Sequence, residues 1–124
     1  MFFIILSVAS AVASSVVDLD ADSIDRFVAD EPATLVKFYA PWCGHCKRIA
    51  EPYALAAERL ESRLGEVDCT RHAAVCTRFE VKGYPTVLVF GADGRARKFS
   101  GKRTTEAFVE AVHEALVVEP RPEL

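Results

Sequence analysis

The sequence predicts an α/β protein in which a central mixed β-sheet carries helices on both faces. Extended and helical apolar patterns alternate along the chain in the order β-α-β-α-β-α-β-β-α, which is typical of a sheet covered by helices. Two extended runs, Ala33 to Ala40 and Thr86 to Phe90, are apolar at almost every position, as expected of strands buried on both faces. The length of 124 residues, 51% of them apolar, is that of one domain.

The charge balance and composition exclude two classes of protein. The 15 basic and 18 acidic side chains leave a formal net charge of −3, so nothing in the overall charge favours nucleic acid as a partner. A charged fraction of 27% together with 8 Phe excludes a disordered chain, because this much apolar surface offsets conformational entropy when it is buried.

The first elements of the domain are a short strand and a short helix. We predict the strand near Val16 to Leu19, and Asp20 or Asp22 can cap the helix that follows. Glu31-Pro32 ends this helix, whose apolar positions recur at helical spacing: Ile24, Phe27 and Val28.

A long helix follows the central strand. Pro41 ends that strand, which only Lys37 interrupts, and a helical pattern begins at Cys43. The apolar positions of this helix are Ile49, Tyr53, Leu55, Ala56 and Leu60.

The second half of the chain predicts three strands and two helices. In order, we expect a strand near Leu64 to Asp68, a short helix around His72 to Arg78, the turn Gly83-Tyr84-Pro85, the strand Thr86 to Phe90, its hairpin partner Arg95 to Phe99, and a last helix with Phe108, Val112 and Leu116 on one stripe.

The segment Met1 to Val17 carries no charged side chain and contains Ala11-Val12-Ala13, a small-residue site of the A-x-A type. We predict a signal peptide at 1–13, the domain at 14–119 and a tail at 120–124. An uncleaved anchor is the alternative, but the serine-diluted run falls short of the ~20 residues that span a bilayer. Secretory entry would place the four Cys where disulfides persist, and we expect no membrane attachment after cleavage.

The strongest chemical signal is Cys43-Gly44-His45-Cys46, directly after a buried strand and at the start of a helix. Helix N-terminal N–H groups and the macrodipole favour a thiolate at this place, and the thiolate is the reactive form of cysteine. Lowering a thiol pKa by about 2 to 4 requires about 3 to 5 kcal/mol, whereas the dipole supplies ~0.3 to 2 kcal/mol. A charged His45 and hydrogen bonds to the Cys43 sulfur are expected to supply the remainder.

The motifs Tyr39-Ala40-Pro41-Trp42-Cys43-Gly44-His45-Cys46-Lys47 and Gly83-Tyr84-Pro85-Thr86 resemble a catalytic domain of the protein disulfide isomerase family. The resemblance implies the thioredoxin fold and thiol-disulfide oxidoreductase activity without a cofactor, in the endoplasmic reticulum lumen or, alternatively, outside the cell. It implies cysteine-containing secretory clients as partners and a thiol oxidase or glutathione for recycling. We expect a monomer.

The resemblance also assigns roles to single residues. It implies that Cys43 attacks a substrate disulfide and that Cys46 resolves the mixed disulfide. It implies a cis Tyr84-Pro85 bond that faces the active site, where the Tyr84 backbone pairs with an extended substrate. Trp42 is expected at the rim of the site. Arg103 corresponds to an Arg credited with adjusting the resolving Cys, or else it is a solvated member of a basic group that guards an edge strand: Arg95, Arg97, Lys98, Lys102 and Arg103.

Two positions depart from the family pattern. Where the family usually buries a Glu as proton acceptor for the resolving Cys, this chain has Lys37. Such a Lys acts only if desolvation keeps it partly neutral, and otherwise extends to the edge of the site. The proline of the long helix, Pro52, stands one position later than is usual in the family, so we expect the helix kink to shift by one residue.

Cys69 and Cys76 form a second pair, seven positions apart. On one continuous helix or strand their Cα atoms would be ~10.5 or ~23 Å apart, beyond the ~7 Å limit for a disulfide. A bond requires Cys69 at a strand end and Cys76 on a helix that folds back, and some isomerase-family domains carry such a pair. We favour a structural disulfide over free thiols or a second redox couple.

Two other classes of function remain open. The first is a peptide-holding chaperone in which the Cys pair is incidental. The second is a metal site made from the four Cys, although their spacing fits neither a zinc knuckle nor an iron–sulfur array, so we expect no metal. The terminal Arg121-Pro122-Glu123-Leu124 resembles a Lys-Asp-Glu-Leu retrieval signal in which Pro122 replaces the acidic residue.

Overall fold

A five-stranded mixed sheet forms the centre of the computed structural model, which describes residues 15–60 and 62–117. The strand order is β1-β3-β2-β4-β5, with β1 and β2 parallel to β3 and the last two strands antiparallel to their neighbours. The strands are β1 Val16–Asp18, β2 Thr34–Tyr39, β3 Leu64–Asp68, β4 Thr86–Phe90 and β5 Ala96–Lys98. The predicted signal peptide and C-terminal tail lie outside the described residues.

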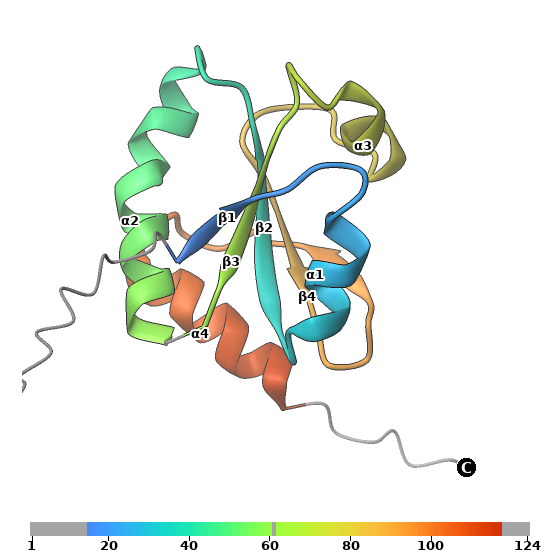
Figure 1. Cartoon of the computed structure of the whole chain (residues 1–124). Helices are drawn as coiled ribbons and strands as arrows, with labels where there is room; N and C mark the ends of the chain where they lie inside the picture. The colour runs from blue at the N-terminus through green and yellow to red at the C-terminus, as the bar shows by residue number, and fades with distance from the viewer. Residues whose placement is uncertain (1–14, 61, 118–124) are drawn as a thin grey trace, which may run out of the picture.

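Four helices flank this sheet: α1 Ile24–Asp30, α2 Gly44–Leu60, α3 Ala73–Arg78 and α4 Thr105–Leu116. The helices α2 and α4 cover one face and α1 and α3 the other (Figure 1), which confirms the predicted architecture. None of the helices among the described residues combines the length and apolar character needed to cross a membrane.

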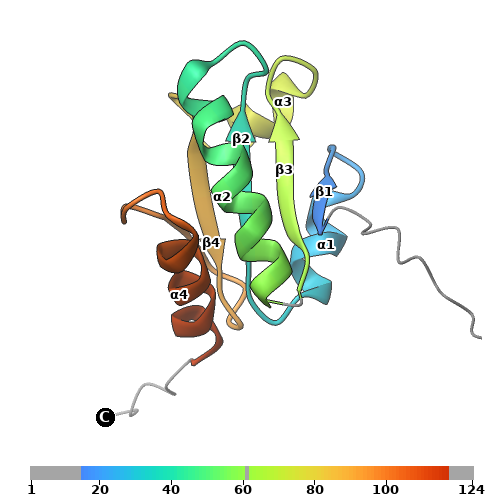
Figure 2. The same cartoon turned by 90° about the vertical axis from the view of Figure 1, so that its left-hand side faces the viewer.

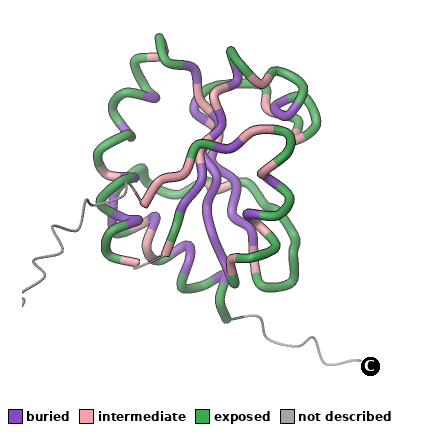
Figure 3. The backbone as a smooth tube through the Cα atoms, viewed as in Figure 1, coloured by how far each residue is buried: buried purple, intermediate pink, exposed green. Residues whose placement is uncertain are grey.

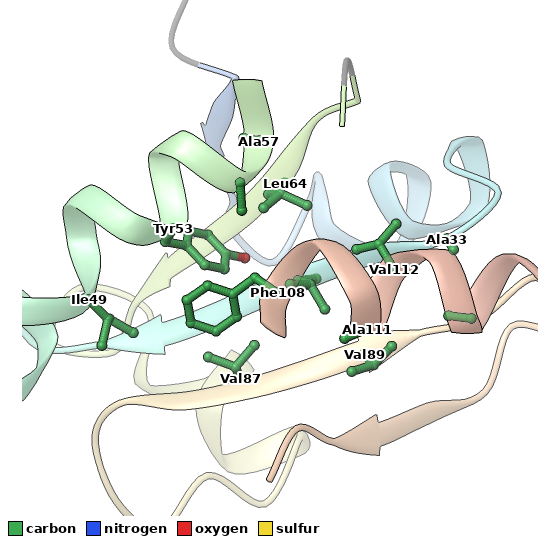
Figure 4. Close-up of a cluster of buried hydrophobic side chains, with 13 residues drawn as sticks. Ala33, Ile49, Tyr53, Ala57, Leu64, Val87, Val89, Phe108, Ala111 and Val112 are labelled. Atoms are coloured by element: carbon green, nitrogen blue, oxygen red, sulfur yellow. The ribbon is translucent and has the colours of Figure 1, made fainter. Parts of the chain in front are cut away.

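Two apolar cores lie on opposite faces of the sheet, and the central strands are buried between them (Figure 3). In the core under α2 and α4, the rings of Tyr53 and Phe108 meet edge to face with centroids 5.4 Å apart (Figure 4). The Tyr53 hydroxyl donates a 2.8 Å hydrogen bond to the Gly65 carbonyl on β3. These contacts fix α2 over the sheet.

Three sequence predictions need correction at this level. Leu55 and Leu116, expected on the buried stripes of α2 and α4, are exposed, because the helices turn the smaller residues Ala57 and Ala115 toward the core instead. Of the two expected caps of α1, Asp20 accepts hydrogen bonds from the backbone N–H groups of Asp22 and Ser23. Ser23 occupies the N-cap position of α1, so neither Asp20 nor Asp22 is the cap; Asp20 holds the turn before the helix.

The second cysteine pair is bonded in the structure. Cys69 follows the end of β3 and Cys76 lies on α3, which folds back so that their Cα atoms are 5.8 Å apart. Both residues are buried in the core beneath α1 and α3. The alternative of two free thiols at these positions does not describe this structure.

Replacing both residues of this pair should destabilise the domain without affecting the other two cysteines. The bond closes a loop with a sequence separation of 7, and in the chain-entropy account a loop of this size is worth about 2 kcal/mol. We therefore expect Cys69→Ala/Cys76→Ala to lose about that much free energy of unfolding in a denaturant titration. Cys43→Ser/Cys46→Ser, which keeps the Cys69–Cys76 bond, is the control. Equal stability of Cys69→Ala/Cys76→Ala and the wild type would contradict a structural role.

Candidate active site

The two remaining cysteines lie where the central strand passes into the long helix. The strands β2 and β3 both point toward the edge of the sheet at which α2 begins (Figure 2). The Cys43 N–H donates to the Ala40 carbonyl at 3.1 Å, and the Cys43 carbonyl accepts from the Lys47 N–H at 3.1 Å. Cys43 therefore occupies the N-cap position of α2, and Pro41 directs the chain out of the strand just before it.

The two thiols differ in access. Cys43 is half-buried, whereas Cys46, one helical turn further, is only 4% exposed. Neither takes part in a disulfide. A substrate can reach the first sulfur directly and the second only through the first, which is the arrangement that the sequence predicts for an attacking and a resolving cysteine.

The helix start stabilises the anionic form of the outer cysteine. A hydrogen bond from the Cys46 backbone N–H lowers the pKa of Cys43, and the Cys46 thiol and the His45 backbone N–H act in the same direction. These N–H groups belong to the second and third residues of the helix, which are the usual donors to an N-cap side chain. His45 thus contributes through its backbone, while its side chain is exposed.

The pKa of the inner cysteine, Cys46, is shifted in the opposite direction. Burial raises the pKa of Cys46, and the neighbouring Cys43 raises it further. The Ala40 backbone and the positive charge of Lys37 lower the pKa of Cys46 and so oppose these effects. The site therefore holds one thiol that ionises easily beside one that ionises reluctantly.

Lys37 does not extend to the edge of the site, contrary to one of the two sequence expectations; it is buried and paired. Its side chain is 5% exposed, and Nζ lies 3.1 Å from Glu66 Oε2 on β3. The parallel register places these two residues side by side on β2 and β3. The ammonium also lies 5.0 Å from the centre of the Tyr53 ring. Sequence reasoning missed Glu66, because only the register between β2 and β3, two strands separated by the whole of α2, identifies it as the partner.

The loop before β4 forms the other wall of the site. The Tyr84-Pro85 peptide bond is cis, and the Cys43 thiol donates to the Tyr84 carbonyl with a sulfur–oxygen distance of 3.8 Å. Trp42 is 69% exposed, and its ring meets that of Tyr84 edge to face with centroids 6.0 Å apart. Trp42, Tyr84 and Pro85 thus gather beside the outer sulfur as expected.

Three further residues from the sequence analysis have clear positions. Arg103 lies in the loop before α4, and its positive charge adds to the effects that lower the pKa of Cys43. Gly44 has open space where a Cβ would stand, so packing does not require a glycine there. Pro52 lies within α2, where its carbonyl accepts a 3.0 Å hydrogen bond from the Thr105 hydroxyl.

These features define a class of protein: an α/β domain with a pair of free cysteines at the start of the helix after the central strand, opposite a cis-proline. The sequence matches the thioredoxin family over residues 15–114, and the chain belongs to that family. The predicted thioredoxin fold is thereby confirmed.

Within the thioredoxin family, the chain is similar to protein disulfide-isomerases. The chain is 42% identical over 103 residues to protein disulfide-isomerase A3 of Gallus gallus, covering 81% of this chain and 20% of that protein. It is 41% identical over 99 residues to protein disulfide-isomerase of Aspergillus oryzae, covering 77% and 19%. The first thioredoxin domain of mouse protein disulfide-isomerase A4 has a similar structure, with a TM-score of 0.75 and 36% identity over 90% of this chain and 84% of that one. The resemblance to isomerase domains is confirmed, and the chain spans about a fifth of the length of these two curated relatives.

Removing the charge of Arg103 should raise the pKa of the outer cysteine, Cys43. Because the Arg103 cation lowers the pKa of Cys43, we expect Arg103→Gln to shift the pH profile of Cys43 alkylation toward higher pH. The measurement is the rate of iodoacetamide labelling of Cys43 against pH, with the labelled residue located by mass spectrometry.

Lys102→Gln is the matched control, since it removes the same charge from the adjacent exposed residue. Coincident pH profiles for Arg103→Gln and Lys102→Gln would show that Arg103 is only one member of a solvated basic group.

Proposed function

We propose that this domain is a thiol-disulfide oxidoreductase that forms, reduces or rearranges disulfides in cysteine-containing client proteins. The observation that supports this most strongly is the pairing of an accessible Cys43, whose pKa is lowered at the helix start, with a buried Cys46, whose pKa is raised. A nucleophile needs the thiolate form near neutral pH, whereas a resolving thiol that stays protonated does not displace the substrate prematurely.

The reducing direction of the reaction runs in two exchanges. The Cys43 thiolate attacks one sulfur of a client disulfide, the client S–S bond breaks, and the other client sulfur leaves as a thiolate. Cys46 then loses its proton and attacks the Cys43 sulfur, which releases the second client thiolate and leaves a Cys43–Cys46 disulfide. The client gains two electrons and the domain loses two; the reverse sequence oxidises a client dithiol.

The loop opposite the cysteines is suited to hold the client. In this proposal the backbone of Tyr84 pairs with an extended client segment, so that the client sulfur lies in line with Cys43. Trp42 covers the rim of the site with a large exposed ring. The position of the Tyr84 carbonyl, 3.8 Å from the Cys43 sulfur, supports this arrangement.

The buried pair of Lys37 and Glu66 supplies the charge beneath the resolving cysteine. The Lys37 cation favours the thiolate of Cys46 against the effect of burial, and Glu66 keeps that cation paired inside the domain. A Lys in this place therefore assists the second exchange electrostatically.

We place this activity in the endoplasmic reticulum lumen, with a secreted protein as the alternative. The uncharged apolar segment before residue 17 and the terminal Arg-Pro-Glu-Leu support this. The Cys69–Cys76 bond is also typical of a protein from an oxidising compartment. Recycling of Cys43 and Cys46 requires a thiol oxidase or glutathione, and no cofactor is needed for the two exchanges.

Single-cysteine variants test the proposed activity. In refolding of a reduced, denatured protein that needs disulfides, we expect the wild type to accelerate recovery and Cys43→Ser to abolish the effect. We expect Cys46→Ser to accumulate a client disulfide-bonded to Cys43, visible on a non-reducing gel, because the second exchange cannot occur. Equal recovery with the wild type and Cys43→Ser would contradict the enzymatic proposal and favour a peptide-holding chaperone.

Replacing Lys37 should slow the second exchange and leave the first unchanged. Lys37→Met removes the cation that lowers the pKa of Cys46, so that pKa should rise and the mixed disulfide should persist longer near neutral pH. The measurement is the decay rate of a preformed mixed disulfide between Cys43 and a peptide, followed against pH.

Since Lys37→Met leaves Glu66 unpaired inside the domain, Lys37→Met/Glu66→Gln is measured beside it to separate this effect from unfolding. Decay as fast as in the wild type in the folded double variant would contradict the role given to Lys37.

A further inference from the structure

A groove of about 800 Å³ runs from the active-site loop toward the edge strand of the sheet. Tyr84 and Pro85 line one part of it, and β5 with the loop that follows lines another. Cys43 does not itself line the groove, but Tyr84 does, and the Tyr84 carbonyl lies 3.8 Å from the Cys43 sulfur. A client segment held at Tyr84 therefore has this groove as its continuation.

The groove is strongly basic although the whole chain has a formal net charge of −3. Five of its lining residues are cationic, and Glu80 is the one acidic residue among them. Arg78 is paired with Asp25 on α1. The other four cations form no ion pair within residues 15–60 and 62–117: Lys82, Arg97, Lys98 and Arg103.

Protection of the edge strand does not explain this arrangement. Cations that only discourage sheet-to-sheet pairing are needed on the edge strand itself, and Arg97 and Lys98 on β5 meet that need. Lys82 and Arg103 belong to two separate loops, before β4 and before α4, yet they border the same groove. Charges of one sign brought together from three segments beside a reactive sulfur indicate a shared ligand of opposite sign.

We infer that this basic groove binds an acidic segment of the client polypeptide next to the cysteine that reacts with Cys43. The inference rests on the proposed function and adds a client class to it: disulfides flanked by Asp or Glu. Carboxylates in the groove would neutralise cations that now lack partners, and the backbone edge of β5 is available to an extended chain. Electrostatic complementarity of this kind favours one partner over another and speeds encounter.

Single-turnover reduction of matched peptides tests the inference. Each peptide has one intramolecular disulfide and is flanked on either side by Asp and Glu, by Asn and Gln, or by Lys. The protein, with Cys43 and Cys46 reduced and the Cys69–Cys76 bond intact, is mixed with each peptide at equal concentration, so that electrons come only from Cys43 and Cys46. At low salt we expect about fivefold faster reduction of an acidic than of a neutral peptide, given the modest worth of each exposed charge pair.

Two variants with the same total charge separate the groove from the charge of the whole molecule. Arg97→Gln/Lys98→Gln removes one Arg and one Lys from the groove, while Arg71→Gln/Lys102→Gln removes the same two residue types from exposed positions outside it. We expect the preference for the acidic peptide to fall to within about twofold in the groove variant and to persist in the control. Reduction of the neutral peptide should stay unchanged in both.

The possible results bear on the two proposals separately. If every peptide is reduced at the same rate by the wild type, or if both variants lose the preference equally, the groove inference is overturned while the oxidoreductase activity stands. If no peptide is reduced by the wild type, the proposed function itself fails. A preference that disappears as ionic strength rises to about 0.5 M supports charge recognition in the groove.

Discussion

The position of Cys43 at the N-cap of α2 is the constraint on which the site depends. The backbone N–H groups of His45 and Cys46 have no partner within the helix there, and they lower the pKa of the Cys43 thiol. The same geometry places Cys46 one turn further along, against the sheet, where burial acts on its thiol in the opposite sense. One helix start thus creates both a reactive and a protected sulfur.

The rest of the domain holds this helix start in position. Tyr53 anchors the middle of α2 through its hydrogen bond to Gly65 and its contact with Phe108. The strand β2 leads directly into the N-cap, and the loop with Pro85 places the Tyr84 carbonyl opposite the sulfur. A displacement of α2 along the sheet would therefore change access to Cys43 and the burial of Cys46 together.

Much of this structure can be predicted from the sequence, because its signals are local. Apolar runs and helical spacing identify all nine elements of the described chain, and the Cys43-Gly44-His45-Cys46 motif after a buried strand identifies the reactive pair. The spacing of Cys69 and Cys76 alone does not predict their bond. The prediction also needs Cys69 at the end of a strand and Cys76 on a helix that folds back toward it.

What the sequence cannot supply is the contact between distant elements. The pairing of Lys37 with Glu66 depends on the register of β2 and β3. The exposure of Leu55 and Leu116 depends on how closely each helix approaches the sheet, and hydrophobicity alone does not determine this. The effect of Arg103 on Cys43 depends on where its loop lies in space. The basic groove is likewise assembled from separate segments.

Separate titration of the two sulfurs tests this account most directly. In the reduced protein with ¹³C-labelled cysteine β-carbons, NMR follows the ionisation of Cys43 and Cys46 as individual curves against pH. The account predicts a Cys43 midpoint well below that of an ordinary cysteine and a Cys46 midpoint above it. Two curves that coincide near the value of a free thiol would contradict it, because the helix start would then favour neither sulfur.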